Sequence, residues 1–73
     1  MPRLPVVSYR DVLKVLRRRG FVFLRQSGSH SQLWHEELRL LATVPHHAEL
    51  ARGTLLSILK QARMTRDEFL RER

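Results

Sequence analysis

Helical spacing of apolar residues near both ends of the chain, with strand-like residues between, restricts the possible folds more than any other feature. Apolar residues recur on one face of a helix from Tyr9 to Leu16 and again from Leu55 to Ala62. Turn residues divide the stretch between them into short β-branched, aromatic and aliphatic segments. Such an order predicts a small antiparallel sheet packed against two helices.

The first helix has clear signals at both ends. Ser8 suits the N-cap, and Asp11, three residues later, completes a variant of the capping box. Arg17, Arg18 and Arg19 complement the dipole of the last turn, and Gly20 suits the left-handed residue that follows a helix. A phosphate contact is the alternative role for these three arginines.

Three strands and two turns are predicted next. The strands are 21–26, 30–35 and 38–44, the turns are 27–29 and 36–37, and Pro45 ends the third strand. Short turns join antiparallel neighbours, so the strands should form a three-stranded antiparallel meander.

After a loop over 45–52, the second helix should begin near Gly53, and Thr65 with Glu68 predicts a capping box for a short final helix. The expected fold class is α+β, in the order α-β-β-β-α plus a short C-terminal helix, in one domain over 1–73. The simplest packing places both main helices on one face of the sheet and leaves the other face free for a ligand or partner. The residues assigned to the core are Phe21, Phe23, Leu40 and Ile58.

Composition restricts the chemistry. The 73 residues include no cysteine, which excludes disulfides, zinc fingers and thiol enzymes. The net charge of +7 is large for this length and favours a polyanion, namely RNA, DNA, a membrane surface or an acidic protein. No apolar run is long enough for a membrane helix and the start lacks a signal-peptide core, so a cytoplasmic location and no membrane partner are expected.

A set of motifs runs through the whole chain in register with these elements. They are the Gly20-Phe21 junction, RQSGSH at 25–30, Val44-Pro45-x-His47, and GTL at 53–55 followed by SILKQA at 57–62. Together they resemble the HicA (YcfA-like) family of messenger-RNA interferase toxins, whose fold is like that of double-stranded-RNA-binding domains. Relatives often carry a glycine near the end of the second helix, where this chain has Arg63-Met64.

The resemblance implies a function and a site. The chain would be the toxin of a type II toxin–antitoxin system, an endoribonuclease that cleaves single-stranded mRNA. No metal or other cofactor is expected, because attack by the ribose 2′-hydroxyl needs none. His30 would be the catalytic histidine, with Gly28 and Ser29 shaping its turn. A HicB-type antitoxin would hold the protein inactive.

The residue types at this turn suit RNA cleavage. The reaction needs a base for the ribose 2′-hydroxyl, an acid for the leaving 5′-oxygen and positive charge beside the phosphate. A histidine such as His30 can act as acid or base near neutral pH. Gly28 lets the backbone approach a phosphate closely, and Ser27 and Ser29 can donate to its oxygens. The alternative is that His30 is an ordinary turn residue that caps a strand end.

Two arginines and one aromatic residue are further candidates for substrate binding. Arg25 and Arg39, on neighbouring predicted strands, could hold the phosphate bidentately. Trp34 has the strand parity of His30 and could stack an unpaired base, although such a tryptophan is often a core residue.

Three residues in the loop and the second helix complete the candidate set. Arg52, beside the start of the second helix, could bind a phosphate together with the free amides there. His47 could support substrate binding or order the loop through a hydrogen bond, whereas His46 is expected to be solvated. A zinc site formed by these histidines with His35 is disfavoured, because no carboxylate or cysteine stands at ligand spacing.

Two rival interpretations belong to other functional classes. A non-catalytic RNA- or DNA-binding module with the same fold could use the same basic surface, because fold alone does not decide function. The basic surface could also exist mainly to bind an acidic protein partner.

Overall fold

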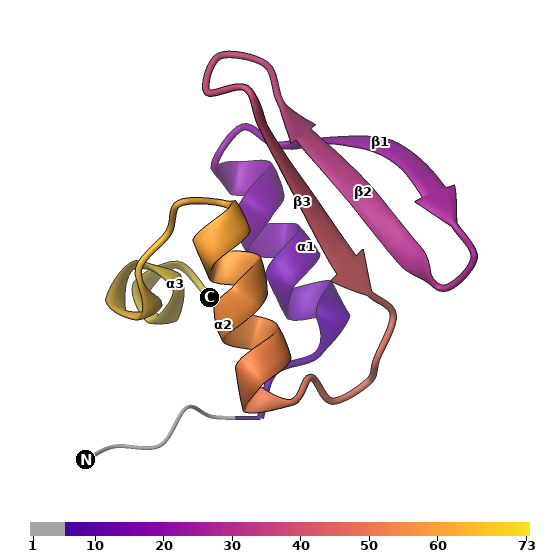
Figure 1. Cartoon of the computed structure of the whole chain (residues 1–73). Coiled ribbons are helices and arrows are strands. Elements are labelled where there is room, and N and C mark those ends of the chain that lie inside the picture. Colours follow the sequence, from indigo (N-terminus) through magenta and orange to yellow (C-terminus); the bar gives the residue numbers. More distant parts are fainter. Residues whose placement is uncertain (1–5) are drawn as a thin grey trace.

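The computed structural model describes residues 6–73, which form a three-stranded sheet and three helices (Figure 1). The elements are α1 (Tyr9–Arg18), β1 (Val22–Ser27), β2 (His30–His35), β3 (Leu40–Pro45), α2 (Arg52–Gln61) and α3 (Arg66–Glu72). Both strand pairs are antiparallel and the sheet order is β1-β2-β3. The α+β class and the predicted order of elements are therefore confirmed.

Helix α1 begins and ends as its sequence predicts. The Ser8 amide donates to the Asp11 carboxylate over 3.0 Å, and the Asp11 amide donates back to Ser8 Oγ over 3.3 Å. Gly20 follows the helix with φ of +98°, and the Phe21 amide donates to the Leu16 carbonyl. These bonds satisfy some of the free backbone groups at the helix ends, and the bend at Gly20 turns the chain directly into β1.

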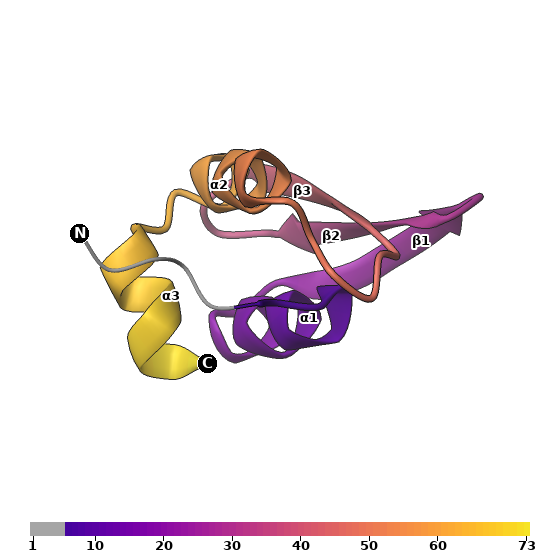
Figure 2. The same ribbon diagram turned by 90° about the horizontal axis from the view of Figure 1, so that it is seen from below.

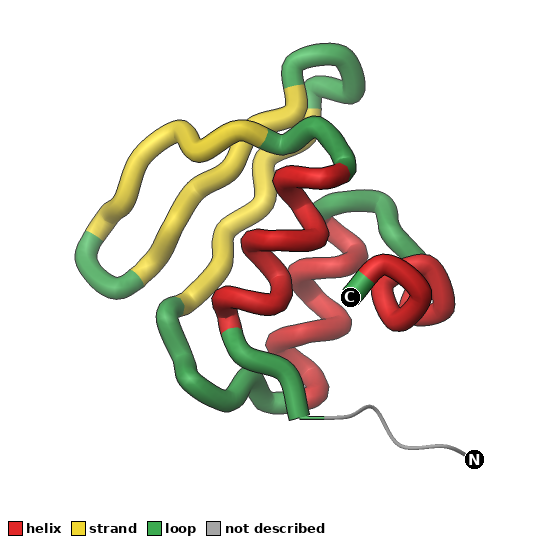
Figure 3. The backbone as a smooth tube through the Cα atoms, turned by 180° about the vertical axis from the view of Figure 1, so that it is seen from behind, coloured by secondary structure: helices red, strands yellow, loops and turns green. Residues whose placement is uncertain are grey.

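Alternation along β2 gives the sheet a covered and an open face. Ser31 and Leu33 are buried opposite Val44 and Ala42 of β3. The residues between them, such as Gln32, point to the other face because side chains alternate along a strand. Helices α1 and α2 lie side by side against the covered face (Figures 1 and 3).

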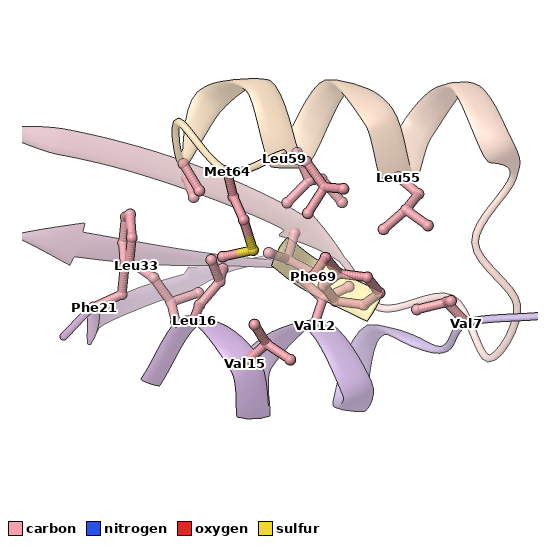
Figure 4. Close-up of a cluster of buried hydrophobic side chains, with 14 of the residues drawn as sticks. Val7, Val12, Val15, Leu16, Phe21, Leu33, Leu55, Leu59, Met64 and Phe69 are labelled. Atoms are coloured by element: carbon pink, nitrogen blue, oxygen red, sulfur yellow. The ribbon is translucent and has the colours of Figure 1, made fainter. Parts of the chain in front are cut away.

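The core lies where α1, α2, α3 and the covered face of the sheet meet. Figure 4 shows side chains from α1 and α2 facing each other, with Phe69 of α3 between them. The core residues are Val7, Val12, Val15, Leu16, Phe21, Leu33, Ala42, Val44, Leu50, Leu55, Ile58, Leu59, Ala62, Met64 and Phe69. Phe21 and Ile58 are thus core residues as predicted, and Leu40 is partly buried against the cluster.

Phe23 was wrongly assigned to the core, since its side chain is 51% exposed. The β1–β2 register shifts between Phe23 and Arg25, which makes Leu24 an extra residue in the ladder. The helices pack mainly on β3, whereas the β1–β2 hairpin extends beyond their ends (Figure 2). The outer strand therefore receives no helix cover at this position.

The element boundaries differ from the prediction by one or two residues. β3 begins at Leu40 instead of residue 38, because Arg39 has a φ of +56° and belongs to the turn. Pro45 is the last residue of β3, and α2 begins at Arg52. No helix within residues 6–73 is long and apolar enough to span a membrane.

Candidate functional site

The β1–β2 turn presents His30 to solvent at the tip of the hairpin. Gly28 has a φ of +59°, and a Cβ added there would meet no atom within 4 Å. Ser27, Ser29 and His30 are all exposed, and His30 is the first residue of β2. The turn is therefore an open stretch of backbone next to an accessible imidazole, and a phosphate could approach it closely.

Arg25 lies on the same face of the hairpin as His30. In the ladder, Ser27 pairs with His30 and Arg25 pairs with Gln32, so each strand contributes residues two apart to the open face. The Arg25 guanidinium donates to Gln32 Oε1 over 2.8 Å. Because this partner is neutral, the positive charge of Arg25 is left without a carboxylate beside it.

A polar cluster on the covered side supports the turn. Ser31, next to His30, is 3% exposed, and its hydroxyl lies 2.5 Å from His46 Nε2. The His46 ring stacks on Tyr9 with 4.7 Å between ring centroids, and its amide donates to the Ser29 carbonyl over 2.7 Å. These contacts attach the hairpin turn to the start of α1.

The expectation that His46 is solvated is therefore wrong, and the two adjacent histidines differ in role. The His47 side chain is exposed, whereas its backbone amide donates to the Pro45 carbonyl and its carbonyl accepts from the Tyr9 amide. His47 orders the loop through backbone bonds and leaves its ring accessible. The sequence signal for His46 is weak, because its partners Ser31 and Tyr9 are distant in the chain.

Trp34 and Arg39 lie at the other end of the sheet from His30. Trp34 is half-buried on the open face, with the Arg39 guanidinium 5.2 Å from its ring centroid. Both side chains donate to the Glu36 carboxylate, over 3.1 Å and 2.8 Å. Arg39 is a turn residue at the opposite end of the sheet from His30. The suggestion that Arg25 and Arg39 hold one phosphate together is therefore wrong.

Arg52 is the exposed first residue of α2. The N-cap residue Ala51 offers no side-chain hydrogen bond, so the first amides of this helix have no side-chain cap. The Leu50 amide donates to the Val7 carbonyl, which brings the start of α2 next to the segment before α1. Arg52 thus lies on the side of the molecule where His47 contacts Tyr9.

Three charged residues at the helix ends, Asp11, Arg19 and Glu68, have partners that shift their pKa values. The Ser8 amide lowers the pKa of Asp11, and the hydrogen bond that Arg19 donates to the Glu72 carboxylate raises the pKa of Arg19. The Thr65 amide lowers the pKa of Glu68, which also pairs with Arg19 at 3.3 Å. Within the described chain, no group of three potential metal-ligating side chains occurs.

The fold and the exposed turn define a small basic α+β domain whose open face can meet an anionic partner. The family model described as the HicA toxin of bacterial toxin–antitoxin systems matches residues 9–64. The chain therefore belongs to the HicA toxin family, and membership implies an antitoxin as its cognate partner. No curated protein matches the chain.

Proposed function

We propose that this toxin is an endoribonuclease that cleaves single-stranded mRNA with His30 as its catalytic residue. The carrying observation is the exposed His30 ring at an open glycine turn, on the same face of the hairpin as Arg25. Family membership supports the proposal, because it makes the chain a toxin that needs a cellular target. The target mRNA lies in the cytoplasm, where the protein would act.

The proposed reaction is an internal transfer at one phosphodiester. His30 takes the proton of the ribose 2′-hydroxyl, whose oxygen attacks the adjacent phosphorus while the bond to the 5′-oxygen breaks. A proton from the imidazolium or from water goes to the departing 5′-oxygen, and a 2′,3′-cyclic phosphate remains. This route uses no metal ion or other cofactor.

Residues around the turn would bind the phosphate. The Arg25 guanidinium can stabilise the charge that develops on the phosphate oxygens. Ser27, Ser29 and the open backbone at Gly28 can donate to the same oxygens. The buried bond between Ser31 and His46 would hold the start of β2, and with it His30, in place.

Trp34, Arg39, His47 and Arg52 would bind more distant parts of the RNA. Trp34 lies four residues along β2 from His30, roughly 13 Å at the rise of a strand. Its ring, over which the Arg39 guanidinium lies, could stack an unpaired base. His47 and Arg52 lie far from Trp34, near the start of α1.

A HicB-type antitoxin is proposed as the partner that blocks this site. An acidic antitoxin surface would associate quickly with the basic toxin and shield the guanidinium of Arg25 from RNA. Binding of this antitoxin should protect single-stranded RNA from cleavage by the toxin.

Incubation of the purified chain with end-labelled single-stranded RNA tests the proposal. We expect cut products that end in a cyclic phosphate or a 3′-phosphate, with cutting unaffected by a chelator. RNA carrying a 2′-deoxy sugar at the cut position should stay intact there, because the attacking hydroxyl is missing. RNA that is bound and shifted in a gel but never cut would contradict the proposal and favour the non-catalytic binding module.

A further inference from the structure

We propose that the outward face of α1 is a second RNA-binding surface, which holds the backbone of the RNA strand after it leaves His30. The surface is a shallow groove lined by Arg10, Leu13, Lys14, Arg17 and Arg18. This inference rests on the proposed function in one respect, since it names the path of the same RNA substrate. The groove would contribute affinity and no chemistry.

The four cations of the α1 groove lie on one side of the helix. Lys14 lies four residues after Arg10, and Arg17 and Arg18 lie three and four residues after Lys14, the spacing that places side chains over one another. Figure 3 shows α1 from the side away from α2, which lies behind it. From Arg10 to Arg18 the groove is roughly 12 Å long at 1.5 Å per residue.

None of these cations forms a salt bridge within the described chain, while the charge of Lys14 helps to lower the pKa of Asp11. The other charged groups of α1 do form salt bridges, since Asp11 lies 3.9 Å from the Arg73 guanidinium and Arg19 pairs with Glu68 and Glu72. Arg18 donates to the Glu72 backbone carbonyl, which leaves its charge uncompensated. A groove with four like charges close together is therefore suited to a ligand that carries regularly spaced negative charges.

The groove begins next to the contacts between Tyr9 and His46 that support the candidate turn. Arg10 lies 5.8 Å from the Tyr9 ring centroid, and Tyr9 stacks on His46. The His46 amide in turn donates to the carbonyl of Ser29, next to His30. A strand bound at His30 thus reaches Arg10 within a few contacts and can continue along α1.

An RNA backbone fits this arrangement better than an acidic segment of a protein. Three of the four cations are arginines, which bind phosphate and carboxylate oxygens bidentately, so the position of the groove decides between the two ligands. Any RNA longer than the scissile dinucleotide must pass over neighbouring surface, and the α1 groove continues from the site by way of Tyr9. An acidic protein segment that binds here instead is an outcome of the test below.

The test compares two double variants that remove the same charge. Lys14→Gln with Arg17→Gln neutralises two exposed cations of the groove and leaves Arg10, which contacts Tyr9, unchanged. Lys60→Gln with Arg71→Gln is the matched control on α2 and α3, where both residues are also exposed and lie in the last helical turn. Both are made in the full chain carrying His30→Ala, so that bound RNA is not cut.

We expect the groove variant to bind a long unstructured RNA roughly five- to tenfold more weakly than the control variant. The slope of log affinity against log salt should fall by about 1.4, which is ~0.7 for each lost phosphate contact on a single strand. In the chain with His30 intact, the groove variant should cut the long RNA less efficiently, whereas its cutting of a dinucleotide should match that of the control.

Equal affinity of both variants for RNA would overturn the inference, since only total charge would then matter. A groove variant that binds RNA normally but loses an acidic peptide would also overturn it and assign the groove to a protein. If RNA is never cut but the groove variant alone binds it weakly, the proposed function fails and the α1 surface stands. If RNA is cut and both variants bind it equally well, the α1 surface fails and the proposed function stands.

Discussion

The helical end of this toxin and the tip of its β1–β2 hairpin are built in opposite ways. Around Phe69, three helices and β3 enclose an apolar core. At His30, by contrast, five consecutive residues from Gln26 onward are exposed, and one buried serine lies just behind them. The contrast indicates that stability comes from one region and the proposed chemistry from the other.

The two regions are joined at few points. The Ser31–His46 bond and the stacking of His46 on Tyr9 link the hairpin turn to α1. Changes within the core should therefore act on the free energy of unfolding, whereas changes at the tip should act on RNA. The predictions below run from the largest expected effect to the smallest.

Replacing Phe69 with alanine should have the largest effect on stability. Its fully buried ring fills the space between α1 and α2, and such a truncation costs about 3–5 kcal/mol of unfolding free energy. Phe23→Ala is the matched control, because that ring is 51% exposed and the cost should stay below about 1 kcal/mol. Urea unfolding followed by circular dichroism measures both. Similar losses in the two variants would mean that the hairpin belongs to the core.

Gly20→Ala should have the next largest effect. The φ of +98° disfavours any side chain, and the new Cβ would lie 2.9 Å from His35 Nε2, so we expect a loss of about 2–3 kcal/mol. Arg63→Gly should do the reverse and gain about 1 kcal/mol, because Arg63 has a φ of +52° after α2. Thermal unfolding of the two variants should move in opposite directions. A shift in the same direction would contradict this account of the helix ends.

Removing the His46 ring tests the link between the two regions. His46→Ala leaves the buried Ser31 hydroxyl without its partner and should cost about 1–2 kcal/mol of unfolding free energy. RNA cutting should fall as well, since the start of β2 is no longer held. His47→Ala should change the unfolding free energy by less than about 0.5 kcal/mol, because that ring is exposed. Equal losses of stability would show that the two histidines do not differ in the way described.

The smallest effect concerns pH and the cap of α1. The Ser8 amide lowers the pKa of Asp11 below its ordinary value of 3.8, so ionised Asp11 stabilises the fold above that pH. This contribution is lost as the pH falls through the lowered pKa. Asp11→Asn should therefore cost about 0.5–1 kcal/mol at neutral pH and almost nothing at a pH near 2, by urea unfolding. A cost that is the same at both values would exclude the charge as its cause.

Local sequence signals predicted most of the fold. The boundaries of α1 and α3 follow from caps within four residues of each helix start, and the turn at Gly28 follows from its own sequence. These features depend on neighbours along the chain, which a sequence displays directly. The exposed position of His30 and its place on the same face of the hairpin as Arg25 belong to the same class.

The errors concern features that depend on distant parts of the chain. Phe23 is exposed because the strand register shifts at Leu24 and because the helices pack mainly on β3. The left-handed conformation of Arg39 moves it from a strand into a turn, although no glycine marks the position. His46 acquires its role only when Tyr9 and Ser31 come together in the folded chain.

Substitution of His30 tests the central claim most directly. Purified wild-type and His30→Ala proteins are compared for cutting of labelled single-stranded RNA and for unfolding in urea. We expect cutting to fall by about 10²-fold or more, while the unfolding free energy changes by less than about 0.5 kcal/mol. A folded His30→Ala protein that cuts RNA at the wild-type rate would contradict the account.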